Sequence, residues 1–136
     1  MLKTGAHYYR QSAALGFDVA QYHLGELYEA GRGVTKDGQE ALRLYGLSAQ
    51  QGNAHAQLRL AELYDAGNLV DHVNLKEAAR LYELAATQGN ATAQYNLADM
   101  YQNGAGVVKN IKTAKLWYTK AAAQGDADAK NALAKM

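Results

Sequence analysis

Acidic side chains recur along this chain at positions that would face the same way on successive helices. Glu26, Glu62 and Asp99 are separated by 36 and 37 residues, and Glu29 and Asp65 follow the first two by one helical turn. Paired carboxylates can transfer protons in acid–base catalysis. On packed helices roughly 8–10 Å apart, however, they would form a column with no implied pocket. The column therefore favours a solvated helix face or a partner-binding surface over catalysis.

Histidines are the other residues that could hold a metal ion. The four histidines, His7, His23, His55 and His72, follow no common spacing, and the chain has no cysteine. His23 and Glu26 would share one face of a helix, but a catalytic zinc site needs a third protein ligand. We therefore predict no metal site and no cofactor, and interpret these histidines as polar surface residues.

Two other patterns associated with catalysis or nucleotide binding lack the context that they need. The Gly-x-Gly pairs at 31–33 and 104–106 would bind phosphate only between a strand and a helix, and here they follow helical segments. Ser12 and Ser48 occupy alanine-like helical positions, whereas a hydrolase serine sits on a strained turn. The sequence therefore predicts that the protein is not an enzyme; a metal-dependent or cell-wall hydrolase is the disfavoured alternative.

Composition excludes several further classes. The 136 residues carry a net charge of +1, which gives no global electrostatic case for nucleic acid, and no apolar run approaches the roughly 20 residues that span a bilayer. Residues 18–104 are nevertheless acidic and residues 105–136 basic. Trp117 and Tyr118 lie at core-type positions within the basic segment, so no aromatic platform for RNA is expected there.

An internal repeat explains where these residues must lie. The block Ala20–Gly25 recurs at residues 56–61, 93–98 and 129–134, and a second block at residues 41–45 recurs at 78–82 and 114–118. Apolar residues within both blocks follow the helical period. Each unit is therefore interpreted as two helices, and we expect helices near 3–15, 18–30, 38–51, 54–66, 75–88, 91–103, 111–124 and 127–136.

Helix boundaries are marked by capping residues. Asn53, Asn90 and Asp126 follow glycines and can accept hydrogen bonds from the first amides of the next helix. Asp37, Asn74 and Asn110 are expected to do the same for the second helix of each unit. Because one helix pair cannot bury its apolar face alone, neighbouring pairs must stack. The predicted fold is all-α: a right-handed α/α superhelix, or solenoid, of about eight helices, with the first helices on the concave side.

The repeat resembles the Sel1-like repeat family, which is related to tetratricopeptide repeats. The resemblance is carried by the segment Ala20–Val34, with its tyrosine, leucine and glycine positions, and by Ala114–Gly125. The sequence departs from the family pattern at two places. Leu69 replaces a loop glycine, which predicts a different loop shape at 67–74. The proline that usually follows Gly-Val is absent. One array would cover residues 1–136: a half-unit at 1–17, repeats at 18–53, 54–90 and 91–126, and a half-unit at 127–136. The half-units could be caps or the ends of a fragment.

The resemblance implies a non-enzymatic adaptor that binds a protein or peptide partner, and the acidic column suggests a basic one. Relatives serve as bacterial signalling or host-interaction factors. The alternative is a structural segment of a longer or self-associating solenoid, and the chain is expected to be a monomer or weak homo-oligomer. No nucleic acid and no membrane insertion are expected; the compartment stays open, with a slight preference for the cytoplasm over the periplasm or secretion. The predicted concave-face residues are Gln21, His23, Glu26, Glu29, Gln57, Arg59, Glu62, Asp65, Gln94, Asn96, Asp99 and Gln102.

Overall fold

The computed structural model describes residues 2–70 and 72–136, with side chains from residue 6 onward. Its described part contains eight α-helices and no strand, so the predicted all-α class is confirmed. The helices are α1 (Leu2–Ala14), α2 (Asp18–Ala30), α3 (Gly38–Gln50), α4 (Ala54–Ala66), α5 (Leu75–Thr87), α6 (Ala91–Asn103), α7 (Ile111–Ala123) and α8 (Ala127–Ala134). The first helices of the three repeats are α2, α4 and α6, and the second helices are α3, α5 and α7.

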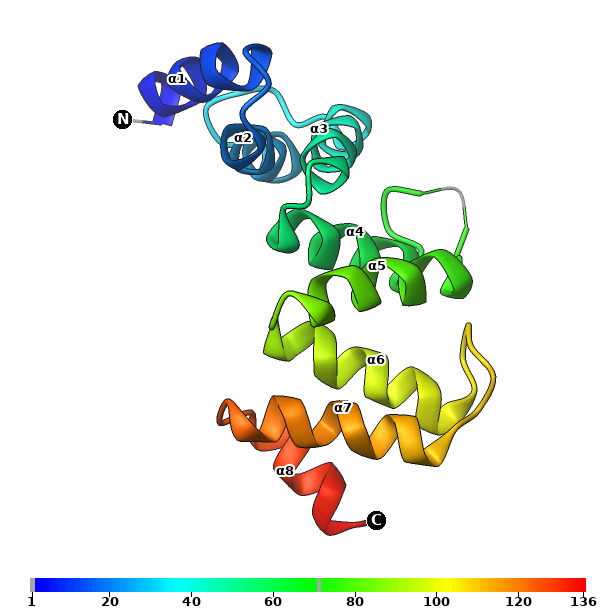
Figure 1. Cartoon of the computed structure of the whole chain (residues 1–136). Helices are drawn as coiled ribbons and strands as arrows, with labels where there is room; N and C mark the ends of the chain where they lie inside the picture. Colours follow the sequence, from blue (N-terminus) through cyan, green and yellow to red (C-terminus); the bar gives the residue numbers. More distant parts are fainter. Residues whose placement is uncertain (1, 71) are drawn as a thin grey trace. The chain divides into compact units, whose positions relative to one another are not determined.

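The chain divides into two compact units, Met1–Leu60 and Ala61–Met136, each with its own core. In the first unit α2 packs against both α1 and α3 (Figure 1). One cluster of its buried core consists of Ala13, Ala20, Leu24 and Leu44. Small alanines at the helix contacts let the backbones approach closely, and the leucines exclude water.

The second unit packs α5, α6, α7 and α8 in chain order (Figure 1). Tyr118 of α7 is buried with Ala98, Ala114, Ala121 and Ala129, and Trp117 packs against this cluster. The prediction that Trp117 and Tyr118 lie at core-type positions is therefore confirmed. None of the described helices has the length and apolar character that crossing a bilayer requires.

The predicted N-caps form in both kinds of helix. Asn53, Asn90 and Asp126 accept hydrogen bonds from backbone amides three residues later at 2.8–2.9 Å. Asp37, Asn74 and Asn110 accept equivalent bonds at 3.1 Å. These bonds satisfy amides that the helix itself leaves unpaired. They fix where each helix begins, and therefore which side chains it presents on each face.

The middle loop keeps one feature of the other two despite losing its glycine. Leu69 has a φ of 62°, close to the 76° of Gly33 and the 73° of Gly106 at the equivalent positions. A left-handed conformation costs a non-glycine residue roughly 1–2 kcal/mol. The predicted change in loop shape therefore does not extend to φ at Leu69.

Candidate functional site

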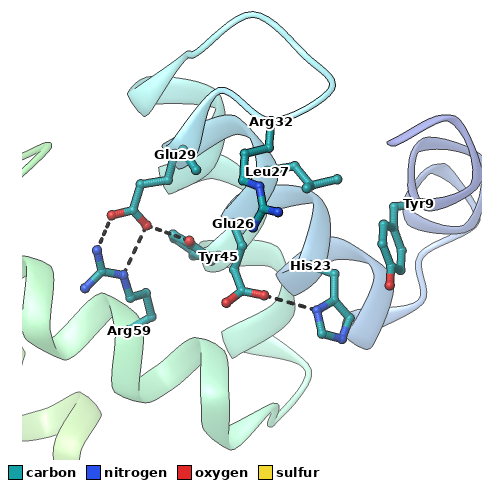
Figure 2. Close-up of a pocket in the computed structure, with 9 residues that line it drawn as sticks. Tyr9, His23, Glu26, Leu27, Glu29, Arg32, Tyr45 and Arg59 are labelled. Carbon is teal, nitrogen blue, oxygen red and sulfur yellow. Dashed lines mark hydrogen bonds and ion pairs between the residues drawn. The ribbon is translucent and has the colours of Figure 1, made fainter. Parts of the chain in front are cut away.

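A recess of about 550 Å³ opens between the first helices of the first unit. Glu26 and Glu29 of α2 form one wall, Arg59 of α4 faces them, and Tyr45 of α3 lies at the base (Figure 2). The remaining lining residues are Tyr9, His23, Leu27, Ala30 and Arg32. We call this the first recess. Its walls carry both acidic and basic side chains, so it is not the purely acidic surface that the column of carboxylates predicts.

Three side chains at the base of the first recess form one hydrogen-bonded network. The Tyr45 hydroxyl donates to Oε1 of Glu29 at 2.7 Å, and Nε of Arg59 donates to the same oxygen at 3.1 Å. The Arg59 guanidinium also forms an ion pair with the second Glu29 oxygen (Figure 2). The network therefore links α2, α3 and α4 across one repeat boundary.

The network sets the charge states of its members. Burial by itself would raise the pKa of Glu29, but hydrogen bonds from Arg59 and Tyr45 outweigh it and leave that pKa below its ordinary value. Burial raises the pKa of the Tyr45 hydroxyl, and its bond to Glu29 raises it further. The hydrogen bond to Glu29 raises the pKa of Arg59. Carboxylate, neutral phenol and guanidinium are thus the stable forms near neutral pH.

The outer part of the first recess holds a histidine–carboxylate pair. Nδ1 of His23 lies 3.1 Å from Oε1 of Glu26, one helical turn along α2 (Figure 2). The centroid of the His23 ring also lies 5.2 Å from that of Tyr9 on α1 and 5.4 Å from that of Tyr22. Across residues 2–70 and 72–136, no three histidine or acidic side chains come together in a way that could hold a metal ion.

A smaller recess of about 370 Å³ occupies the equivalent place in the second unit. It is lined by Glu62, Asp65, Ala66, Tyr82 and Asn96, and we call it the second recess. The Tyr82 hydroxyl donates to Oδ2 of Asp65 at 3.0 Å, as Tyr45 does to Glu29. Burial raises the pKa of Tyr82, and the charges of Asp65 and Glu62 raise it further. Both carboxylates therefore act on this hydroxyl.

The third repeat anchors its tyrosine with one neutral and one charged acceptor. The Tyr118 hydroxyl lies 2.7 Å from Oε1 of Gln102 and 3.1 Å from Oδ1 of Asp99. Gln102 stands where the earlier repeats have Glu29 and Asp65. The third repeat therefore has an uncharged amide oxygen as the acceptor at this position, where the others have a carboxylate. A buried second-helix tyrosine tied to the first helix is thus a feature of all three repeats.

Three of the predicted surface residues lie inside the helix packing and are removed from the candidate surface. Gln21, Gln57 and Gln94 are 3–4% exposed. Each donates through Nε2 to a backbone carbonyl near the end of the preceding helix, that of Ala13, Ala49 or Ala86. A buried amide needs such a partner. These glutamines therefore hold consecutive helices together and are not available to a partner.

The other nine predicted residues retain access to solvent, in two separate groups. The first unit contributes His23, Glu26, Glu29 and Arg59; the second contributes Glu62, Asp65, Asn96, Asp99 and Gln102. The tyrosine hydroxyls at the base of the recesses were missed as site groups, because their spacing identifies them as core residues. The signal that could have identified them is their identity: leucine or phenylalanine would fill a core position without needing a hydrogen-bond acceptor.

Comparison with known proteins relates the whole pattern to one family. The Sel1 repeat model matches residues 2–17, 18–53, 54–90 and 91–126. A Sel1 repeat protein of Oxalobacter formigenes is similar at 36% identity and a TM-score of 0.91, with 96% of this chain and 97% of that chain covered. A comparison with curated proteins gave no match.

Two further solved structures are similar. A protective antigen of uropathogenic Escherichia coli with an SLR fold is 41% identical, with a TM-score of 0.87 over 97% of this chain; the matched region is 28% of that protein. Cysteine-rich protein B of Helicobacter pylori has 23% identity and a TM-score of 0.74, with 97% of this chain and 94% of that chain covered. At that identity the similarity concerns the fold alone.

Proposed function

Because the chain belongs to the Sel1 repeat family, whose members are generally protein–protein interaction scaffolds and typically not enzymes, we propose that it binds a protein or peptide partner. The proposed surface is the exposed face of the first helices α2, α4 and α6, expected to be concave. Its residues are His23, Glu26, Glu29, Arg59, Glu62, Asp65, Asn96, Asp99 and Gln102.

The observation that carries this proposal is that each of the three repeats holds a buried tyrosine hydroxyl in a fixed position against its first helix. Tyr45, Tyr82 and Tyr118 are at most 1% exposed, yet each presents its hydroxyl to an acceptor on a first helix. Groups that are already ordered lose little conformational entropy when a partner binds. This supports preformed binding groups within each unit, on α2 in the first and on α4 and α6 in the second.

Charge supports a basic partner. On the proposed surface five side chains are acidic, Arg59 is the one that is always cationic, and Arg59 is paired with Glu29. Complementary charge accelerates encounter and disfavours partners of the same sign. A partner segment rich in lysine or arginine is therefore favoured over an acidic one.

Affinity capture from the source organism, followed by binding measurements with the purified partner, tests the proposal. The variant Glu26→Ala/Glu62→Ala/Asp99→Ala is expected to bind at least ten-fold more weakly, because it removes one acidic group from each repeat. Glu83→Ala is the matched control, since Glu83 is an exposed carboxylate on the second helix α5. Equal loss in both variants, or no loss in the triple variant, would contradict the proposed face.

Self-association is a second candidate that one observation favours. Large apolar side chains are exposed at Leu15, Phe17 and Val19 in the first unit, and at Val108 and Leu116 in the second. Apolar groups left in water favour association with another apolar surface. Light scattering across a concentration series tests this candidate, and a monomer at every concentration would contradict it.

A further inference from the structure

The first and second recesses are the same structural position in consecutive repeats, with Asp65 in place of Glu29 and Asn96 in place of Arg59. Glu26 and Glu29 correspond to Glu62 and Asp65, and Tyr45 corresponds to Tyr82. The residue contributed by the first helix of the next repeat differs between the two recesses. It is Arg59 in the first recess and Asn96 in the second.

The first recess shows how this arrangement of acceptors holds a guanidinium of the chain itself. The guanidinium of Arg59 forms an ion pair with Glu29, and the Tyr45 hydroxyl donates to the same carboxylate. A guanidinium is planar and presents several N–H donors in a fixed fork, which suits a carboxylate and a neighbouring oxygen. An arginine of the chain itself thus occupies the position that a ligand would take in an otherwise equivalent recess.

The second recess keeps these acceptors but has a shorter side chain in place of the arginine. Asp65 accepts a hydrogen bond from Tyr82, and Asn96 lines the recess beside them. Among its described lining residues none is cationic, and a space of about 370 Å³ remains. The acidic residues Glu62 and Asp65 lie one turn apart on α4 and border this space.

We propose that the second recess binds the guanidinium group of an arginine side chain supplied by the partner protein, in the manner in which Glu29 holds the guanidinium of Arg59 in the first recess. The proposal rests on the proposed function and deepens it, because it assigns the chemistry of one contact and its place. Asp65 would accept N–H bonds from the fork, and Glu62 would contribute charge from the adjacent turn.

The geometry favours arginine over lysine at this place. An ammonium group is a compact, strongly hydrated charge, whereas the guanidinium fork can contact a carboxylate and the tyrosine oxygen together. The Tyr82 hydroxyl donates to Asp65, so its own oxygen lone pairs can accept a further N–H. The recess therefore offers acceptor oxygens from two helices: the carboxylate of Asp65 on α4 and the hydroxyl of Tyr82 on α5.

Titration with Nα-acetyl-arginine amide, followed by the backbone amide resonances of the whole chain, tests the proposal. We expect saturable shifts at Glu62, Asp65, Ala66 and Asn96. The uncharged isostere Nα-acetyl-citrulline amide is expected to produce none, and Nα-acetyl-lysine amide is expected to bind several-fold more weakly. Shifts of equal size with the citrulline probe, or no shifts at these residues with the arginine probe, would overturn the proposal.

Two exchanged variants add an internal guanidinium to the second recess and remove it from the first. Asn96→Arg supplies an internal guanidinium, so we expect probe binding at the second recess to weaken at least ten-fold. Arg59→Asn removes the internal guanidinium, so we expect new saturable shifts at Glu26, Glu29 and Ala30. If neither variant changes its own recess, the proposal is wrong.

Asp65→Asn provides a test that does not depend on a larger side chain being accommodated. It keeps the shape of the recess and removes one charge, and probe binding is expected to fall at least five-fold in a chain of unchanged circular dichroism. The partner distinguishes the two proposals. If Glu62→Ala weakens partner binding while the arginine probe never binds, the proposed function stands and the guanidinium site does not.

Discussion

The hydroxyl of Tyr45 lies 2.7 Å from Oε1 of Glu29, and this hydrogen bond joins the second helix of a repeat to the first. The same relationship recurs between Tyr82 and Asp65 at 3.0 Å. In both pairs the phenol ring is buried and the carboxylate borders a recess. The interaction therefore serves two purposes, because it fixes the angle of a helix pair and orients an acceptor at the surface.

Removing one hydroxyl measures this interaction. Tyr82→Phe keeps the ring in the core and deletes the bond to Asp65, and hydrogen bonds to charged groups contribute about 1.5–3 kcal/mol. Because Asp65 is exposed to water, we expect a decrease of about 1–2 kcal/mol in the free energy of unfolding, measured by urea denaturation. Tyr8→Phe is the control. Tyr8 is 64% exposed, and a comparable loss there would refute the assignment.

Close packing around Tyr45 gives a second prediction. A β-carbon at Gly25 would lie 2.8 Å from Cε1 of the Tyr45 ring, whereas one at Gly46 would meet no atom within 4 Å. Replacing an unhindered helical glycine with alanine is worth roughly 0.5–1 kcal/mol. We therefore expect Gly46→Ala to stabilise the chain by about that amount.

Gly25→Ala should lose this gain, because overpacking costs about 1–3 kcal/mol when a ring must move. Displacement of Tyr45 would also lengthen its bond to Glu29, which a crystal structure of the variant would detect. Thermal denaturation of the two variants side by side provides the comparison. Equal stabilisation by both would show that the Tyr45 ring yields without cost.

The low pKa of Glu29 predicts how stability changes in acid. Burial opposes ionisation, but the hydrogen bonds from Arg59 and Tyr45 prevail, so the folded chain holds the carboxylate more strongly ionised than the unfolded chain does. This contribution is present above the unfolded pKa of about 4.3 and is lost as pH falls through the lower, folded value. The free energy of unfolding should therefore decline below about pH 4.5.

Comparison with Glu29→Gln isolates that contribution. The variant lacks the titrating group, so its stability should fall less steeply than that of the wild type between about pH 5 and pH 3. The two curves should converge at the acidic end, where Glu29 is protonated in the wild type. Parallel curves over this range would assign acid sensitivity to other carboxylates.

Periodicity predicts the helices of this fold well, because burial and capping are local properties. Helix α4 was predicted at 54–66 and is found at Ala54–Ala66, and the caps Asn53 and Asn90 are found where expected. Whether a single polar side chain is buried or exposed, in contrast, depends on how the neighbouring helix packs against it. Gln94 was therefore assigned to the surface, although it donates to the carbonyl of Ala86.

The candidate site shows the same limit. Spacing places Glu29 and Arg59 on first helices, but the ion pair between them depends on the stagger of two helices that the sequence does not specify. A recurring glutamine beside an alanine at a helix contact was an available signal, since a polar residue repeated next to the core usually has an internal partner. The recesses themselves could not be predicted, because they follow from the lengths of side chains that meet across helices.

Alkaline pH should expose the buried tyrosines together. Burial is the main cause that raises the pKa of Tyr45, Tyr82 and Tyr118 in the folded chain, and the nearby carboxylates add to it. A raised folded pKa means that the associated stability is complete below the unfolded value of about 10 and is lost as pH rises above it. These hydroxyls should therefore ionise as the helices unfold, in a cooperative step.

Tyrosinate absorbance at 295 nm and helical circular dichroism, followed over the same alkaline titration, check this expectation. The late absorbance step should coincide with the loss of helix, and in Tyr82→Phe its amplitude should fall by the contribution of one tyrosine. Ionisation of all ten tyrosines while the helical signal is intact would show that these three hydroxyls are open to solvent.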